Sequence, residues 1–218
     1  MMSSRSHKRE KSSLYFDVLE ASKSEGCVVC ALLKDVVESY LANLLYENVN
    51  DGVTRSQLRQ SLGFCRDHAS ALMNNGDPFG VAIIYQDILQ SILNGLSKGD
   101  RESLTPALEC PACTYQAHFA RIYIELFAEY LHDKELKRAL HGSDGLCLIH
   151  LAQLTAGIHE NGTKNELLSV QERRLDTMRK NLSEFVRKQD IQYRNEITSP
   201  EEDASCERAI DFLVGKND

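Results

Sequence analysis

The chain has 218 residues, of which 42% are hydrophobic and 26% are charged, with 12 Gly and 4 Pro. This composition is typical of a globular protein and excludes a fibrous or disordered chain. The net charge of −7 and the absence of Trp argue against nucleic-acid binding, which requires a basic face and favours bases stacked on aromatic rings.

Hydrophobic periodicity predicts helices along the chain and gives no clear strand signal, so we expect an all-α fold. In the first half, Thr54 and Gln57 are a candidate capping box, and the pair Asp77-Pro78 is a typical helix start. The predicted helices of this half cover 31–48, 55–62, 65–75 and 78–99.

The second half repeats this order of helices. Thr163 and Glu166 form a candidate capping box for a long helix over 164–194, and Ser199-Pro200 starts a last helix that ends near Val214. Apolar residues at near-heptad spacing on the long helix predict packing on its own domain, with a homodimer seam as the alternative. The stripe consists of Leu168, Leu175, Met178, Leu182 and Phe185.

Six of the seven cysteines fall into two similar sets, each a Cys-x-x-Cys followed by a Cys-x-x-His. The two motifs are separated by 34 residues in the first set and by 33 in the second. Gly63 and Gly145 each stand two residues before the Cys of their Cys-x-x-His motif. This repetition predicts an internal duplication, with a first repeat over 14–99, a second over 100–195 and a C-terminal helix and tail over 196–218.

The two sets predict metal sites. Residues three apart on a helix share one face, so the Cys and His of each Cys-x-x-His can bind one ion, and a Cys-x-x-Cys at a helix start adds two thiolates. Three thiolates and one imidazole are a common set for structural zinc, so we expect two zinc ions per chain. The candidate ligands are Cys27, Cys30, Cys65, His68, Cys110, Cys113, Cys147 and His150.

The duplication favours one site per repeat, and the segment 49–64 is long enough to bring the chain back to the first Cys pair if its short helix folds back. A partition across the repeats remains the alternative. An iron–sulfur cluster is the main chemical alternative to zinc. A thioredoxin-like pair would need a βαβ context, and disulfides are disfavoured in the cytoplasm.

Two further expectations concern single features of the chain. We expect the seventh cysteine, Cys206, to be a small buried apolar residue of the last helix. The longest apolar run has about seven residues, against the roughly 20 of a membrane span, and the basic N-terminus lacks the apolar block of a secretory signal. We therefore expect a cytoplasmic protein that has no membrane partner.

The motif order is specific enough to suggest a family. It runs from Glu25-Gly26-Cys27-Val28-Val29-Cys30 through Leu62-Gly63-Phe64-Cys65-Arg66-Asp67-His68, Glu109-Cys110-Pro111-Ala112-Cys113 and Gly145-Leu146-Cys147-Leu148-Ile149-His150 to Ala209-Ile210-Asp211-Phe212-Leu213-Val214-Gly215. From about residue 14 to 215 the chain resembles an uncharacterised bacterial family, domain of unknown function 6062. The resemblance implies paired Cys and His sites without an established activity.

The expected function is that of a binding or regulatory scaffold for a protein partner. The alternative is a redox or metal sensor whose thiolates oxidise or exchange metal. The sequence offers no acid, base or nucleophile that could be nominated for catalysis, so it favours a protein that is not an enzyme.

Overall fold

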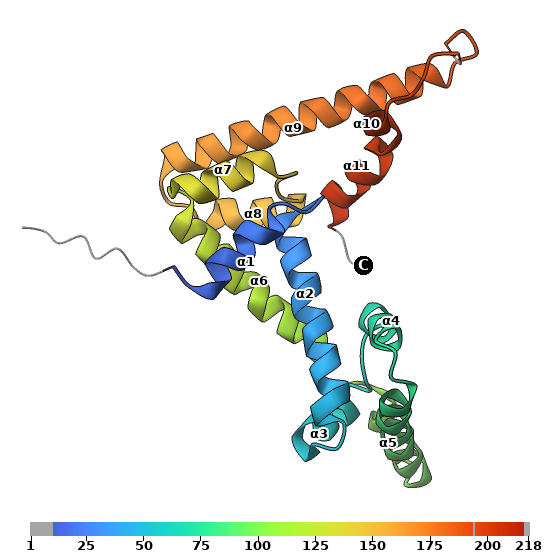
Figure 1. Ribbon diagram of the computed structural model, residues 1–218. Coiled ribbons are helices and arrows are strands. Elements are labelled where there is room, and N and C mark those ends of the chain that lie inside the picture. Colours follow the sequence, from blue (N-terminus) through green and yellow to red (C-terminus); the bar gives the residue numbers. More distant parts are fainter. Residues whose placement is uncertain (1–10, 194, 216–218) are drawn as a thin grey trace, which may run out of the picture. The chain divides into compact units, whose positions relative to one another are not determined.

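The structure is a computed structural model that describes residues 11–193 and 195–215 (Figure 1). These residues form helices and loops and contain no strand, which confirms the predicted all-α class. The helices are α1 (Ser13–Ala21), α2 (Val28–Asn43), α3 (Gly52–Gln60), α4 (Arg66–Asn74), α5 (Pro78–Ser97), α6 (Pro111–Tyr130), α7 (Lys134–Gly142), α8 (Leu148–Gly157), α9 (Asn161–Lys188), α10 (Pro200–Asp203) and α11 (Ser205–Val214).

Two shorter segments complete the described helical structure, a π-helical continuation of α2 over Leu44–Asn48 and a 3-10 turn over Glu102–Leu104. None of the helices in the described ranges is both long enough and apolar enough to cross a membrane.

The chain divides into two compact units, and the division falls inside α2 and α6. Among the described residues, unit 1 contains 11–32 and 123–215 apart from residue 194, and unit 2 contains 33–122. Each unit thus combines residues from both halves of the sequence. The repeat boundaries predicted above, 14–99, 100–195 and 196–218, describe the duplication of the sequence and remain a prediction.

Unit 1 is organised around α9, against which α10 and α11 lie (Figure 1). A salt bridge between Lys137 Nζ and Glu166 Oε2, 2.5 Å long, joins α7 to the same helix. On α1, the fully buried Tyr15 donates a hydrogen bond of 2.8 Å from its hydroxyl to Asp133, the N-cap residue of α7. Polar contacts therefore join α1 to α7 and α7 to α9 within this unit.

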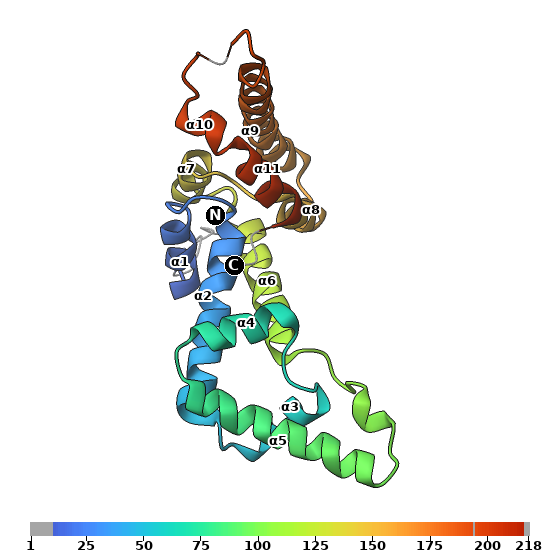
Figure 2. The same ribbon diagram turned by 90° about the vertical axis from the view of Figure 1, so that its right-hand side faces the viewer.

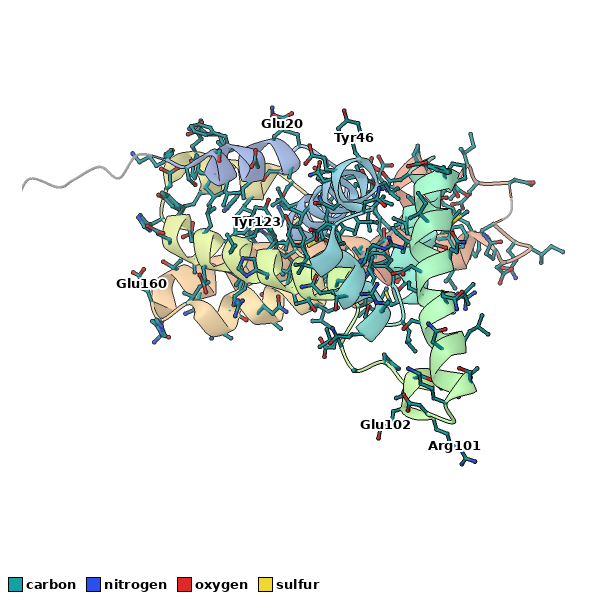
Figure 3. The ribbon with its side chains drawn as sticks, turned by 90° about the horizontal axis from the view of Figure 1, so that it is seen from below. Glu20, Tyr46, Arg101, Glu102, Tyr123 and Glu160 are labelled. Carbon is teal, nitrogen blue, oxygen red and sulfur yellow. The ribbon has the colours of Figure 1, made fainter. Side chains whose placement is uncertain are left out.

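Unit 2 has its own apolar core, formed where α2, α3, α4 and α5 meet (Figure 2). Leu41, Leu58 and Leu72, from three of these helices, are almost completely buried. Asp87 of α5 accepts charged hydrogen bonds from two arginines of α3, which fixes these two helices to each other. Tyr46, in the π-helical segment, points away from the core into solvent (Figure 3).

The predicted helix starts are partly confirmed. Asp77 caps α5 and is followed by Pro78, as expected, and Ser199 forms a capping box with Glu202. The capping box predicted for Thr54 and Gln57 is wrong. The helix α3 begins earlier, at Gly52, because the Asp51 carboxylate accepts a hydrogen bond from the Thr54 N–H at 2.7 Å.

The capping box at Thr163 is also wrong, because α9 already begins at Asn161. The Thr163 hydroxyl instead donates to the carboxylate of Glu160, the N-cap residue. The long helix ends at Lys188 rather than near 194, and Lys188 forms a 2.6 Å salt bridge with Glu202. This ion pair holds the chain where it folds back toward α10.

Candidate metal centres

The first cluster of Cys and His side chains, site 1, lies within unit 1 and consists of Cys27, Cys30, Cys147 and His150. Cys27 directly precedes α2, and Cys30 lies in its first turn. Cys147 is the N-cap residue of α8, and His150 lies in the first turn of that helix. The four possible ligand atoms lie within 4.8 Å of one another.

The second cluster, site 2, lies within unit 2 and consists of Cys65, His68, Cys110 and Cys113. Its construction is the same as that of site 1. Cys65 is the N-cap residue of α4, His68 lies in the first turn, and the other two cysteines lie at the start of α6. These ligand atoms also lie within 4.8 Å of one another.

The structure therefore brings all eight predicted ligands into two groups, but the expectation of one site per repeat is wrong. Each Cys-x-x-Cys lies with the Cys-x-x-His of the other repeat, which is the alternative partition. The physical reason lies in α2, which runs unbroken over 28–43 and continues to residue 48. At about 1.5 Å per residue this helix carries the chain roughly 30 Å along its axis, and the segment that follows closes on α6 instead of folding back.

The distances within site 1 fit one tetrahedral ion. The sulfur atoms of Cys30 and Cys147 lie 3.8 Å apart. The His150 Nδ1 atom lies 3.4, 3.5 and 3.2 Å from the sulfur atoms of Cys27, Cys30 and Cys147. With metal–sulfur bonds of about 2.3 Å and metal–nitrogen bonds of about 2.0 Å, the edges of a tetrahedron are about 3.8 and about 3.5 Å.

Site 2 has the same geometry. The sulfur atoms of Cys65 and Cys113 lie 3.7 Å apart, and His68 Nδ1 lies 3.2, 3.6 and 3.4 Å from the sulfurs of Cys65, Cys110 and Cys113. In both sites the sulfur pairs are well beyond the length of a disulfide bond, about 2.05 Å. Two Cys3His groups of this structure could therefore each hold a metal ion.

A glycine with positive φ lies two residues before each Cys-x-x-His motif. Gly63 has φ +92° and Gly145 has φ +91°, values that a residue with a side chain adopts only under strain. A Cβ at Gly145 would also overlap the side chains of Arg174 and Gln171. The carbonyl of Gly145 accepts a hydrogen bond of 3.1 Å from the Val28 N–H, which joins the two ligand loops of site 1.

The model of the Family of unknown function (DUF6062) matches residues 14–108 and, a second time, residues 105–218. The chain belongs to this family. Each of the two DUF6062 matches contains one complete set of Cys-x-x-Cys and Cys-x-x-His, so the duplication seen in the motifs extends to the repeats around them.

A curated relative is similar to this DUF6062 chain over nearly its whole length. It is named "Uncharacterized 23.9 kDa protein in xynA 3'region", from Caldicellulosiruptor sp. (strain Rt8B.4). The two proteins are 28% identical over 202 residues, which cover 91% of this chain and 99% of the relative. No solved structure matches the chain.

Side chains of α9, which sequence reasoning missed, support the ligand loop of site 1 in this DUF6062 chain. Gln171, 3% exposed, donates a hydrogen bond of 3.1 Å from Nε2 to the carbonyl of Leu146. Arg174 donates to the carbonyl of Leu140, in the last turn of α7, the helix that precedes the loop. In the sequence both residues appear as ordinary polar positions of a long amphipathic helix, so no pattern distinguished them.

The C-terminal end of α11 also reaches site 1. Gly215, buried and at φ +78°, lies so close that a Cβ on it would be 3.6 Å from the sulfur of Cys30 and 3.8 Å from that of Cys147. Site 2 has different neighbours: Gly63 packs on Tyr85 and Ile88 of α5.

The pKa values of the ligand side chains are shifted by burial and by the contacts between these side chains. In site 2, burial lowers the pKa of His68, which favours the neutral imidazole that binds metals, and burial and neighbouring thiols raise the pKa of Cys113 to about 12. In site 1, hydrogen bonds from Cys27 and Cys30 lower the pKa of Cys147.

Burial lowers the pKa of His150, but hydrogen bonds with Cys147 and Cys27 outweigh this effect and raise it to about 9. Three thiolates this close repel one another, so a full set of thiolates requires a cation between them.

The prediction for the seventh cysteine is wrong. Cys206 is exposed on α11 and belongs to neither site. The helix buries Ser205 instead, so a shift of one position around α11 turns the thiol toward solvent.

Proposed function

We propose that this protein binds two zinc ions, one at each Cys3His site, and that the ions stabilise a cytoplasmic helical scaffold for a protein partner. The observation that carries the proposal is the set of sulfur–nitrogen and sulfur–sulfur distances, 3.2 to 3.8 Å in both sites. These distances suit a single ion bound by four protein atoms.

The donor set supports zinc among the metals. Three thiolates with one imidazole are soft to borderline ligands, and zinc accepts a tetrahedral arrangement of them without a geometric preference of its own. An iron–sulfur cluster places several iron and sulfide atoms between its ligands, so it needs donors that lie further apart than four atoms around one ion. All donor pairs within 4.8 Å favour the single ion.

The number of protein ligands supports a structural role. Four donors fill a tetrahedral shell and leave no position for water or substrate, so this arrangement supports a scaffold more than an enzyme. Each ion would join segments far apart in the sequence, such as the start of α2 and the start of α8 in site 1. Zinc binding would therefore contribute directly to folding.

The surface of unit 2 supports a protein partner. Phe79, Leu89 and Leu93 of α5 are each more than half exposed, which is unusual for large apolar side chains gathered on one helix. A homodimer through 164–194 has less support, because α10 and α11 already lie against part of α9.

Elemental analysis of the purified protein tests the proposal. We expect two zinc ions per chain and a colourless solution, and we expect Cys65→Ser and Cys147→Ser each to lose one ion. The matched control is Cys206→Ser, because Cys206 is exposed and outside both sites, and it should retain two ions. A protein without metal, or one that contains iron and absorbs visible light, would contradict the proposal.

A further inference from the structure

The two sites differ in how far their thiols are covered. In site 1 all four ligands are buried, with exposed fractions of 9% for Cys27 and 1% for Cys147. In site 2 His68 is buried, but the three cysteines remain partly exposed. Solvent, and any dissolved ion or chelator, therefore reaches the sulfur atoms of site 2 more readily.

The cover of site 1 comes from the end of the chain. Gly215 lies beside the sulfurs of Cys30 and Cys147, which a Cβ on it would contact at 3.6 and 3.8 Å, and its N–H is fixed by a hydrogen bond of 3.0 Å to the carbonyl of Asp211. Because α11 packs against both α8 and α9, this cover can leave the site only if α11 separates from two helices.

The ligand loop of site 1 is held from a second side by α9. The hydrogen bond from Gln171 to Leu146 acts on the residue directly before the ligand Cys147. Arg174 donates to Leu140, in the last turn of α7, and its guanidinium lies where a Cβ on Gly145 would be. A movement of the loop away from the other ligands of site 1 would break the contact with Gln171.

A cleft of unit 1 borders site 1. A cleft of about 600 Å³ in unit 1, between α9 and the α10–α11 segment, has Cys27 and Cys147 in its wall. Their small exposed fractions mean that the cleft reaches the edge of the site without opening it.

The loop of site 2 rests on a different surface. Its glycine, Gly63, packs against Tyr85 and Ile88, whose nearest carbon atoms would lie 3.4 Å from a Cβ at this position. The segment before Cys110 is joined to α3 by hydrogen bonds from Ala107 and Leu108 to the carbonyl of Gln60, at 2.7 and 3.2 Å. These contacts hold the loops but leave the three cysteines partly exposed to solvent.

We propose that the two sites have different tasks: site 1 retains its ion, whereas site 2 exchanges its ion with thiophilic divalent cations in solution. This inference rests on the proposed zinc binding. In the exchange one divalent cation enters and one leaves, new metal–sulfur and metal–nitrogen bonds replace the old ones, and the three thiolates and the imidazole are unchanged. An incoming cation must contact a thiolate before the old ion leaves, and all three cysteines of site 2 are partly exposed, whereas those of site 1 are at most 9% exposed.

The first test follows metal release from the zinc-loaded full chain into excess chelator, with 4-(2-pyridylazo)resorcinol as the probe. We expect two phases of one ion each, with the fast phase about tenfold faster or more, since access to site 1 requires local opening. Cys65→Ser should lack the fast phase and Cys147→Ser the slow one. Equal rates, or a fast phase that belongs to site 1, would overturn the proposal.

A second measurement needs no variant. During release, N-ethylmaleimide is added to the wild-type protein and the modified cysteines are mapped by mass spectrometry. Cys206 should react first as an internal reference, then the three cysteines of site 2, and last those of site 1. Simultaneous modification of both sites contradicts the proposal, whereas a purified chain without metal contradicts the proposed function itself.

The support from α9 can be tested separately. Gln171→Leu should accelerate the slow phase several-fold while two ions remain bound, because the loop loses the hydrogen bond from Gln171 to the carbonyl of Leu146. Glu172→Gln is the matched control, since Glu172 is the exposed neighbour on the same helix, and it should leave both phases unchanged. An unchanged slow phase in Gln171→Leu would mean that α9 does not slow the release of metal from site 1.

Discussion

Sites 1 and 2 are nearly identical in their ligands and differ in what surrounds them. Both place a Cys at the N-cap of a helix, a His in its first turn and a Cys-x-x-Cys at the start of another helix. Yet site 1 is covered by α9 and by the end of α11, whereas site 2 leaves three thiols partly exposed. A short local motif thus determines the coordination geometry, while the neighbouring helices determine access to the ion.

Of the changes considered, metal removal should have the largest effect on the stability of the protein. Zinc contributes on the order of 10 kcal/mol to the folding of small zinc domains, so removal of both ions should abolish or strongly broaden the cooperative unfolding transition. Thermal unfolding followed by circular dichroism checks this, with zinc added back as the control. Identical unfolding curves with and without metal would mean that neither site stabilises the fold.

Substitution of the two loop glycines should have a smaller and unequal effect. A side chain at φ near +90° costs about 1–3 kcal/mol, so Gly63→Ala and Gly145→Ala should both lower the free energy of unfolding. The loss should be larger at Gly145, where the new Cβ would displace the ends of Arg174 and Gln171 and disturb their hydrogen bonds to Leu140 and Leu146, than at Gly63, where the contacts are ordinary. Urea unfolding of the zinc-loaded variants measures the difference, and equal losses would argue against a tighter loop in site 1.

The smallest expected effect concerns Asp133, which lies in unit 1 away from both sites. Burial raises the pKa of this carboxyl group, but hydrogen bonds from Tyr15 and from the start of α7 outweigh it and hold the pKa below the usual value of 3.8. The stabilisation is therefore present above about pH 4 and disappears as the pH falls toward the lowered pKa.

Urea midpoints of wild type and Asp133→Asn should converge as the pH decreases from 6 to 3. Loss of metal in acid is common to both proteins, so their difference isolates Asp133. A difference that stays constant over this range would exclude the carboxylate as its source.

Much of the fold was predictable because its signals are local. Asp77-Pro78 and Ser199-Pro200 start helices through hydrogen bonds to residues two or three positions away, so the sequence contains both partners. The eight ligands were predictable for the same reason, since each motif spans only four residues.

The pairing of the motifs was not predictable from spacing. It depends on the direction in which α2 carries the chain, and 34 intervening residues are compatible with a return or with a departure. The roles of Gln171 and Gly215 depend on the packing of α9 and α11 against loops distant in the sequence. Such contacts have no local signal.

The exchanged pairing also has a consequence for the order of folding. Site 2 joins His68 to Cys110 across 42 positions, and this loop lies entirely inside the 117 positions that separate Cys30 from Cys147 in site 1. The entropy cost of closing a loop grows with the logarithm of its length, so a closed inner loop shortens the outer one to about 75 positions and saves roughly 0.4 kcal/mol. The inner connection should therefore form first and strengthen the outer one about twofold, which makes the more accessible ion the earlier step in assembling the chain.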